Sequence, residues 1–507
     1  MKVNKLLGSV GIAVLMLTAC ATNDGSEQKG ELQKSQKEIN PDFADLDDSA
    51  DTLHEPVSIE DFEPETIPSN TEVTYDLDVK MEEEGNFQLN ASSMIESTSD
   101  DAWEELVFYV IPNAFTEENK PDEVGGANEL DIESVQVDGE NVPYSLENDT
   151  LALELEEPLE KGEEVEADIA YTFSLPEDGF RFTQSDEGYF LGQFYPMLAT
   201  YRDGWNKEDY NPTGESYHTD FSDFTVNYEI PDGYTVFSSD ESENDEEATS
   251  GEFSMENIKE FYMAVLKTDA IDVHQEDHDG TEVRLITEPD DENAENSLDI
   301  AVDSLDFFEK HIGEYPHNQL DVIVTETDEG GMEYPGIVTV MDNPEGMKEV
   351  IPHELGHQWF YGMVSNDAYY DPWVDEGITQ FLTTIYLANR EMTFDKEELL
   401  TFIGGQIYEG RKKDTILPAN HSLDTYDKGD NQMLYSLSVY SQPTYELYSL
   451  FAKHDGEEEA LEFLHDYFEE YQYEQVDSEE LLNYLASYLD INDEEDFENW
   501  LEVENKS

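Results

Sequence analysis

The sequence predicts an α+β chain of several domains, with a β-sandwich-like N-terminal domain followed by a mostly helical domain. Two patterns support this prediction. Between about residues 71 and 270, apolar residues alternate with polar ones, which is typical of half-buried strands. From about residue 290, apolar residues recur every three or four positions, which is typical of amphipathic helices. A length of 507 residues allows roughly two to four domains.

The composition indicates a folded protein with a very acidic surface. Hydrophobic residues make up 38% of the chain and aromatic residues 12%, which is enough to build cores. The chain has 124 acidic and 24 basic residues, a formal net charge of −100, so it lacks the clustered Lys and Arg that nucleic acid binding requires. A single Cys excludes an intramolecular disulfide framework.

Two interpretations of the acidity are open. The charge can keep the protein solvated in salty or alkaline surroundings, or it can attract cationic ligands. The acidic residues are spread along the whole chain and do not form one tract, which favours a solvated surface.

The N-terminus has the features of an export signal. Lys2 and Lys5 precede an apolar run from Leu6 to Leu17, which is too short to span a bilayer but suits a signal peptide. The run ends in Leu-Thr-Ala-Cys, which resembles the lipobox of bacterial lipoproteins and implies lipidation of Cys20. An ordinary secretory signal is the alternative. We therefore expect a body that is lipid-anchored to the cell membrane on its extracytoplasmic face, with no second membrane crossing.

These observations divide the chain into four parts. Residues 1–19 are the predicted lipoprotein signal peptide, and residues 20–70 are acidic and poor in aromatic residues, as in a disordered tether. Residues 71–270 form the predicted β-rich domain, and residues 271–507 the domain with the C-terminal helices.

Individual strands of the first domain follow from the period-two pattern. Residues 73–81 and 87–91 flank the turn residues Glu84-Gly85-Asn86, which predicts a β-hairpin. Similar alternation predicts strands at 151–155, 165–173 and 224–230, and the acidic, Ser-rich residues 239–250 predict a loop.

Helices follow from the spacing of apolar residues in the second half. Leu298, Leu305 and Phe308 share one face of a predicted helix that ends near Gly313, and Val322–Val324 is a short buried strand. Further helices are expected at 352–364, 373–389, 442–453, 457–471 and 478–488, the last opened by a capping box of Asp477 and Glu480.

The string His353-Glu354-Leu355-Gly356-His357 carries the strongest chemical signal. Positions i and i+4 share a helix face, so the two imidazoles converge on one point, and Glu354 lies beside them. A catalytic zinc needs three protein ligands and one open position, and Glu376 follows His357 after 18 residues within Trp373-Val374-Asp375-Glu376-Gly377. The sequence therefore predicts one zinc ion held by His353, His357 and Glu376.

These residues resemble the gluzincin metallopeptidases of the M1 aminopeptidase family. Gly331-Met332-Glu333-Tyr334 resembles the G-x-M-E-N exopeptidase motif, and the segments 191–196 and 204–206 resemble the N-terminal domain of smaller bacterial members. The resemblance covers about residues 71–490 and implies a thermolysin-like zinc peptidase domain.

The resemblance also implies the roles of individual residues. Glu354 activates the attacking water, Tyr440 stabilises the oxyanion, with Tyr435 as a nearby competitor, and Glu333 binds the free α-amine of a peptide substrate, with Gln193 assisting. The other histidines, such as His218, His311 and His421, lack partners at i+4 and are expected on the surface.

Several residues depart from the family pattern. Tyr334 replaces the motif's Asn, Tyr361 stands where the family often has Gly, and Gln442-Pro443 replaces the Lys-Gly that commonly follows the tyrosine. Pro352 precedes the first histidine, so the helix either starts there or is kinked. The long C-terminal helical domain of larger members is missing, so we expect an open site that admits peptides longer than dipeptides.

Three functions follow from these features. The first is a zinc aminopeptidase that removes N-terminal residues from peptides outside the cell, and side activity on non-peptide substrates is not excluded. The second is a zinc endopeptidase of thermolysin-like type, with the same water chemistry but no anchor for the amine. The third is a non-catalytic, zinc-binding surface lipoprotein, for which Glu354 would serve no purpose.

Overall fold

The computed structural model describes residues 53–54 and 62–504, apart from gaps at 83–84, 122–123, 178, 212, 241–247, 326–329, 345, 391–395, 414, 427–431 and 492–495. The predicted signal peptide, Cys20 and most of the predicted tether lie outside the described residues, as does the middle of the predicted loop at 239–250.

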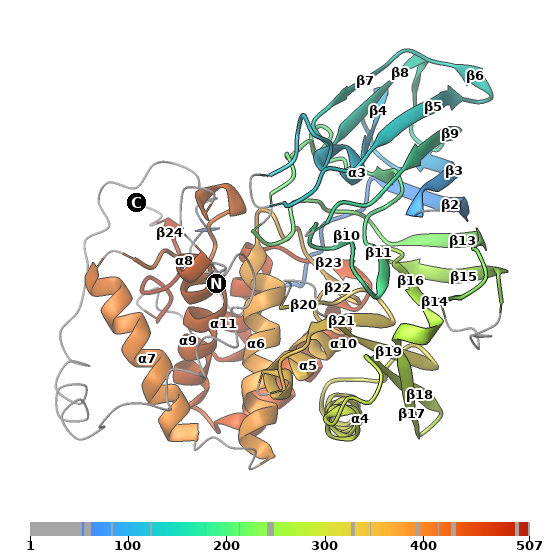
Figure 1. The fold of residues 1–507 in the computed structure, drawn as a ribbon. Coiled ribbons are helices and arrows are strands. Elements are labelled where there is room, and N and C mark those ends of the chain that lie inside the picture. The colour runs from blue at the N-terminus through green and yellow to red at the C-terminus, as the bar shows by residue number, and fades with distance from the viewer. Residues whose placement is uncertain are drawn as a thin grey trace.

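The first part of the chain is built from three β-sheets around one core (Figure 1). The largest sheet has the strand order β15-β13-β2-β3-β9-β5-β6, formed by β2 (Thr71–Met81), β3 (Phe87–Ser97), β5 (Leu130–Val137), β6 (Glu140–Asn141), β9 (Glu164–Phe173), β13 (Ser222–Glu229) and β15 (Ser250–Ile258). A second sheet has the order β12-β4-β8-β7, formed by β4 (Trp103–Tyr109), β7 (Tyr144–Glu147), β8 (Thr150–Leu159) and β12 (Met197–Leu198). The short helix α3 (Ile111–Ala114) follows β4.

The period-two pattern explains the largest sheet. Every second residue of β2 is buried, from Thr71 to Met81, and β2 pairs with β3 in the antiparallel register Met81↔Phe87. The predicted hairpin and the strands predicted at 151–155, 165–173 and 224–230 are all present. Alternation places one face of each strand in the core because successive side chains point to opposite faces.

A third sheet lies between this core and the rest of the molecule. Its order is β10-β11-β16-β14, formed by β10 (Phe182–Gln184), β11 (Gly188–Leu191), β14 (Tyr234–Ser238) and β16 (Met263–Lys267). Side chains from β11, β14 and β16 share a hydrophobic cluster with Ile323 and Ile337 of the next sheet, so the two parts of the chain are packed together.

The second part begins with a five-stranded sheet of order β17-β18-β19-β21-β20. Its strands are β17 (Asp272–His278), β18 (Thr281–Thr287), β19 (Gln319–Thr325), β20 (Gly331–Met332) and β21 (Ile337–Met341). The amphipathic helix α4 (Ala294–His311) connects β18 to the parallel strand β19 and packs against α5. β20 forms one edge of the sheet, runs antiparallel to β21 and lies beside α5.

Helices make up most of the remaining chain (Figure 1). Most of them share one large hydrophobic core, while Ile403 and Ile407 belong to a separate small cluster. The helices are α5 (Met347–Gly356), α6 (Pro372–Asn389), α7 (Lys396–Lys413), α8 (Gln432–Tyr435), the π-helical turn η6 (Ser436–Ser441), α9 (Gln442–Phe451), α10 (Glu457–Tyr471) and α11 (Ser478–Tyr488). The helices predicted at 373–389, 457–471 and 478–488 are present within one residue of the predicted bounds.

Other helical details differ from the predictions. α5 begins at Met347 and ends at Gly356, so Pro352 lies inside the helix and the prediction of a helix over 352–364 is wrong. The sequence did not predict α7. Asp477 caps α11 by accepting the backbone N–H of Glu480, but the carboxylate of Glu480 accepts bonds from Tyr471 and from the backbone of Glu65.

Residues 62–67, which the sequence analysis assigned to the tether, lie on the helical part. The backbone N–H of Ile67 donates to the carbonyl of Gln475 at 2.9 Å, and the ring of Phe62 meets the ring of Tyr484 at 6.2 Å. A two-residue pairing joins β1 (Leu53–His54) to β24 (Val503–Glu504), and another joins β22 (Val364–Ser365) to β23 (Glu474–Gln475). Within the described ranges, no helix is both long and apolar enough to cross a bilayer.

Candidate metal centre

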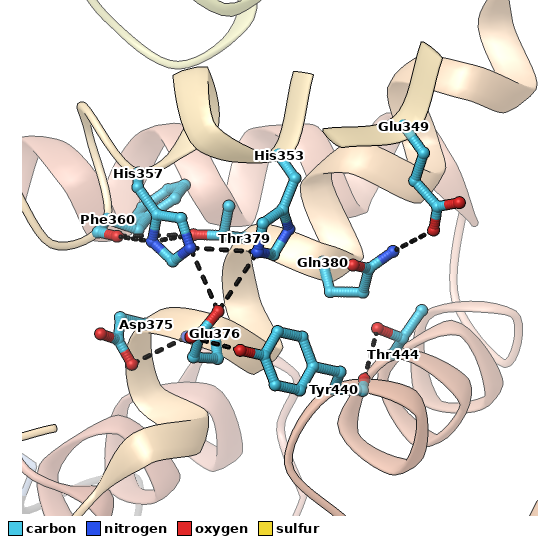
Figure 2. Close-up of polar contacts among 10 residues, drawn as sticks. All are labelled: Glu349, His353, His357, Phe360, Asp375, Glu376, Thr379, Gln380, Tyr440 and Thr444. Atoms are coloured by element: carbon cyan, nitrogen blue, oxygen red, sulfur yellow. Dashed lines mark hydrogen bonds and ion pairs between the residues drawn. The ribbon is translucent and has the colours of Figure 1, made fainter. Parts of the chain in front are cut away.

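Two adjacent helices bring the predicted metal ligands together (Figure 2). α5 carries His353 and ends at the Ccap residue His357, while Glu376 lies in the second turn of α6. Nε2 of His353, Nε2 of His357 and Oε2 of Glu376 are each 3.2 Å from the other two atoms. The i, i+4 spacing on α5 supplies the pair of histidines, and the packing of α5 on α6 supplies the carboxylate.

These distances fit a zinc ion. Metal–ligand bonds of about 2.0–2.2 Å at tetrahedral angles separate neighbouring ligand atoms by about 3.3 Å. The tautomer fits as well, because Nδ1 of His357 lies 2.9 Å from the carbonyl oxygen of Phe360 and is placed to donate to it, which leaves Nε2 with a free lone pair. Thr379 adds a hydroxyl 3.2 Å from the same Nδ1.

Glu354 lies beside the triad and against the edge strand β20. A methyl group at Gly331 would lie 2.1 Å from Oε1 of Glu354, so only a glycine leaves room for this carboxylate. Burial, followed by the charge of Glu333, raises the pKa of Glu354 well above its ordinary value. A bound dication acts in the opposite direction and favours the ionised carboxylate that a general base needs.

Glu333 is the next carboxylate along the site. Its ligand atom lies within 4.8 Å of those of His357 and Asp375, and burial raises its pKa to about 7. Gln358 holds the surrounding backbone: its Nε2 donates to the carbonyl of Tyr334 at 3.1 Å, and its Oε1 accepts from Gly336 N–H at 2.9 Å. Gln358, which directly follows His357, therefore fixes the backbone next to Glu333.

Tyr440, the predicted oxyanion donor, lies in the metal centre. Its hydroxyl donates a hydrogen bond to Oε1 of Glu376 (Figure 2), and its ring lies 5.8 Å from the ring of His353. Burial raises the pKa of Tyr440 well above its ordinary value, so the hydroxyl remains a donor at neutral pH. Tyr435, the alternative candidate for the oxyanion donor, is buried in the core. Its ring lies edge-on to the rings of Tyr426 and Tyr440.

The π-helical turn η6 contains Tyr440 and has a local cause. Pro443 lacks the N–H that an α-helix would direct to the carbonyl of Val439, and the proline ring occupies that space. Gly377 accommodates this turn, since a methyl group there would lie 2.9 Å from the Pro443 ring and 3.1 Å from the carbonyl oxygen of Val439.

Gln193 lies in the β domain, close to the exopeptidase-like motif. The residue is 1% exposed and has a positive φ of 54°. A methyl group at the preceding Gly192 would lie 2.4 Å from the hydroxyl oxygen of Tyr334, so the two segments touch. Tyr334 itself stacks on Tyr262 with ring centroids 4.0 Å apart.

Sequence reasoning missed several residues of this region. Asp375 is buried, and burial and the neighbouring Glu376 raise its pKa to about 8; its only signal was its place directly before the third ligand. Glu215, Tyr217 and Glu260 had no motif that would single them out among 124 acidic residues and 29 tyrosines.

The prediction that the remaining histidines lie on the surface is wrong for two of them. His218 is 2% exposed and His421 is 3% exposed, whereas His311 is partly buried against Phe307. Burial, together with the nearby Lys259, lowers the pKa of His218, so it packs as a neutral imidazole. The absence of a second histidine four residues away excludes a metal site of the His-x-x-x-His kind. It does not show whether the histidine is buried or exposed.

Comparison with known proteins gives a consistent result. Residues 296–500 match the model of the peptidase family M1 domain. The chain is 27% identical over 223 residues to mitochondrial aminopeptidase 2 of Saccharomyces cerevisiae, covering 40% of this chain and 23% of that protein. It is also 27% identical over 213 residues to leukotriene A-4 hydrolase of Xenopus laevis, covering 39% of this chain and 34% of that protein. The chain thus spans 23% of the length of the first relative and 34% of the length of the second.

The fold matches solved structures over nearly its whole length. A mutant of an M1 zinc metallopeptidase from Deinococcus radiodurans, bound to a Tyr-Ser-Ala substrate, superposes with a TM-score of 0.58 at 16% identity, covering 89% of this chain and 99% of that chain. The matched residues 296–500 contain both histidines, Glu354, Glu376 and Tyr440. Residues 296–500, which carry the predicted metal ligands, are thus similar to the peptidase family M1 domain.

Proposed function

We propose that the protein is a zinc-dependent aminopeptidase that removes N-terminal residues from peptides. The observation that carries the proposal is the position of Glu333, a buried carboxylate within 4.8 Å of the His357 and Asp375 ligand atoms. A carboxylate this close to His357, one of the predicted zinc ligands, can bind the α-ammonium group of a peptide and so place its first peptide bond at the metal centre.

The site residues divide the chemistry among themselves. A zinc ion held by His353, His357 and Glu376 would supply a Lewis acid that polarises the scissile carbonyl and makes a bound water more acidic. Glu354 accepts a proton from the attacking water and returns it to the leaving amine. The Tyr440 hydroxyl is a donor to the oxyanion that develops on the carbonyl oxygen. Gln193 is a second acceptor for the substrate ammonium.

The arrangement of the second domain supports assignment to the thermolysin-like type of zinc peptidase. The edge strand β20 lies beside α5, the helix with the two histidines, and α6 supplies the third ligand from the other side. The edge of a sheet can pair with an extended peptide through backbone hydrogen bonds. A peptide bound along β20 would therefore lie close to the metal position, since β20 lies beside α5. The acidic surface disfavours nucleic acid as a partner.

One experiment tests the activity and separates it from the alternatives. Hydrolysis of an aminoacyl amide reporter with a free amine is compared with that of its N-acetylated twin, with zinc content assayed in parallel. We expect cleavage of the free amine alone, loss of activity on chelation and recovery on adding zinc. Cleavage of both reporters at equal rates would indicate an endopeptidase, and cleavage of neither by zinc-loaded protein would indicate a binding protein.

The matched control is Glu354→Gln, which keeps the shape of the side chain and removes the proton acceptor. We expect kcat to fall at least about 100-fold while zinc content is unchanged, because Glu354 is not a ligand of the predicted metal. A variant with full activity would contradict the assignment of Glu354 as the base.

We also propose that the mature protein is anchored by lipid at Cys20 and works at the extracytoplasmic face of the cell membrane. The proposal rests on the charged, apolar and Leu-Thr-Ala-Cys segments of the sequence. Cys20→Ser is expected to move the protein from the membrane fraction to the soluble fraction without changing its kcat. Membrane retention of this variant would contradict the lipid anchor.

A further inference from the structure

A chain of buried polar side chains crosses the junction between the β domain and the metal-binding helix. Gln193, Tyr217 and Glu260 belong to the β domain, and Tyr361 follows α5 by five residues. All four are at most 4% exposed. Buried polar groups of this kind are retained where each has a partner, and here the partners are one another.

The hydrogen bonds from both sides point toward Glu260. Nε2 of Gln193 donates to the hydroxyl oxygen of Tyr217 at 2.6 Å. The Tyr217 hydroxyl faces the two carboxylate oxygens of Glu260, at 3.1 and 3.3 Å, and Oε1 of Glu215 at 3.2 Å. The Tyr361 hydroxyl donates to Oε1 of Glu260 at 2.5 Å. A carboxylate accepts hydrogen bonds and does not donate them, so the Tyr217 hydroxyl proton points to one of these carboxylates. The Tyr217 oxygen then accepts a hydrogen bond from the NH2 group of Gln193.

This direction decides which side of the Gln193 amide faces the substrate. The NH2 group is bound to Tyr217, so the carbonyl oxygen Oε1 is the side that can accept from an ammonium group. Burial and the neighbouring carboxylates raise the pKa of Tyr217 well above its ordinary value, which keeps its proton in place throughout the neutral range.

The two residues at the ends of this hydrogen-bonded series, Gln193 and Tyr361, have a backbone conformation that L-residues rarely adopt. φ is 54° at Gln193 and 136° at Tyr361. Such conformations persist where surrounding contacts fix them, and they concentrate at functional sites. At Tyr361 the backbone N–H bonds to the carbonyl of Val364 at 2.9 Å, and the ring meets the ring of His357 edge-on at 6.4 Å.

We propose that Tyr217 and Tyr361 are positioning residues for amine recognition, which act through Glu260 to hold Gln193 with its carbonyl oxygen toward the substrate ammonium. This inference rests on the proposed aminopeptidase function. The hydrogen-bonded series begins at Tyr361, next to the metal-binding helix, and ends at Gln193. Contacts at the junction between the domains therefore affect how the substrate amine is bound.

The junction has further connections that Tyr217→Phe and Tyr361→Phe leave intact. Nζ of Lys259 donates to Oγ of Ser365 at 2.7 Å, and the hydrophobic cluster around Tyr262, Tyr334 and Ile337 also spans the two parts. Loss of one tyrosine hydroxyl therefore leaves the domains packed together. The effect of such a variant on the amine can then be measured in a folded protein.

The test uses the full-length, zinc-loaded protein and four variants. Tyr217→Phe and Tyr361→Phe remove one hydroxyl each. Tyr361→Gly removes the side chain at a φ that glycine readily adopts, which guards against misfolding. The control is Tyr75→Phe, which removes another buried hydroxyl of the same domain. That hydroxyl accepts from the backbone N–H of Leu198 at 2.8 Å and does not belong to the hydrogen-bonded series described above.

The readout is the inhibition constant of an amino-acid hydroxamate and of its desamino counterpart, together with KM and kcat for the free-amine reporter. We expect the three Tyr217 and Tyr361 variants to weaken the amino compound and raise KM by about tenfold, with kcat and the desamino constant within about twofold of wild type. Tyr75→Phe should leave the ratio of the two inhibition constants unchanged.

Two results would be decisive against these ideas, and they differ. If the wild type binds both hydroxamates equally, the proposed amine recognition itself fails. If the wild type prefers the amino compound and the Tyr217 and Tyr361 variants keep the same preference, or lose affinity for both compounds equally, the aminopeptidase remains and the positioning role of the two tyrosines is wrong.

Discussion

The hydroxyl of Tyr440 donates to Oε1 of Glu376, while Oε2 of the same carboxylate lies 3.2 Å from Nε2 of both histidines. One oxygen of Glu376 thus faces the metal position and the other holds the hydroxyl proposed to stabilise the oxyanion. The carboxylate sets the distance between the metal and this donor, because its two oxygens are fixed relative to each other.

Tyr440→Phe should therefore lower kcat for the free-amine reporter by about 100-fold or more, with KM within about threefold, because the donor acts on charge that develops in the transition state. Steady-state kinetics with zinc content measured in parallel checks this. Tyr435→Phe is the matched control, since its ring packs in the core, and it should retain kcat. A fall in kcat with Tyr435→Phe but not with Tyr440→Phe would reverse the assignment.

Gly331→Ala should displace Glu354. The added methyl group would lie 2.1 Å from Oε1 of that carboxylate, well inside contact distance. A shift of about 1 Å in a catalytic group can cost about 100-fold in rate, so we expect kcat to fall by that order. Zinc content should be unchanged, because Glu354 is not among the three converging ligand atoms. The prediction fails if kcat stays within about threefold of wild type.

Glu349→Gln should change how stability depends on pH. Glu349 is buried, accepts from Nε2 of Gln380 at 3.3 Å, and has its second oxygen without a hydrogen-bond partner among the described residues. Burial raises its pKa from 4.5 to about 8. Between these values the folded state holds a proton that the unfolded state has lost, so this group makes the protein less stable as pH rises.

Glutamine does not titrate, so the free energy of unfolding of Glu349→Gln minus that of the wild type should increase between pH 5 and 8 and level off above. The slope approaches about 1.4 kcal/mol per pH unit within the window. Denaturant unfolding of both proteins at several pH values measures it, with Glu256→Gln as a control at an exposed carboxylate. A difference that is constant across the range would show that Glu349 titrates normally.

Added salt should stabilise the protein. The 24 basic residues cannot neutralise 124 acidic ones, and the remaining carboxylates repel one another at low ionic strength. Screening shortens the range of this repulsion from about 30 Å at 0.01 M to about 3 Å at 1 M. We expect the melting temperature of the zinc-loaded protein to rise by several degrees between low and molar NaCl. A melting temperature that falls over this range would argue against a surface limited by self-repulsion.

Local pattern was enough to predict much of the architecture. The alternation at residues 73–91 predicted the β2–β3 hairpin, and the spacing of apolar residues predicted α6, α10 and α11. The predicted helix over 352–364 was wrong, and of the two alternatives at Pro352 the start of a helix is excluded, because α5 begins at Met347. In the structure the packing of α5 against α4, α6 and the sheet holds the helix together through that residue.

The sequence by itself predicted the metal ligands, because His353 and His357 are joined by one turn of helix and Glu376 follows at a short spacing. Tertiary structure alone decided how the rest of the site is arranged. In the folded protein Glu333 lies close to His357, and the hydroxyl that bonds to Glu376 belongs to Tyr440 and not to Tyr435. His218 and His421 are buried. Tyr217 and Glu260 connect Gln193 to Tyr361 by hydrogen bonds. These contacts join residues far apart in the chain, and their geometry depends on how helices and sheets pack, which no local period encodes.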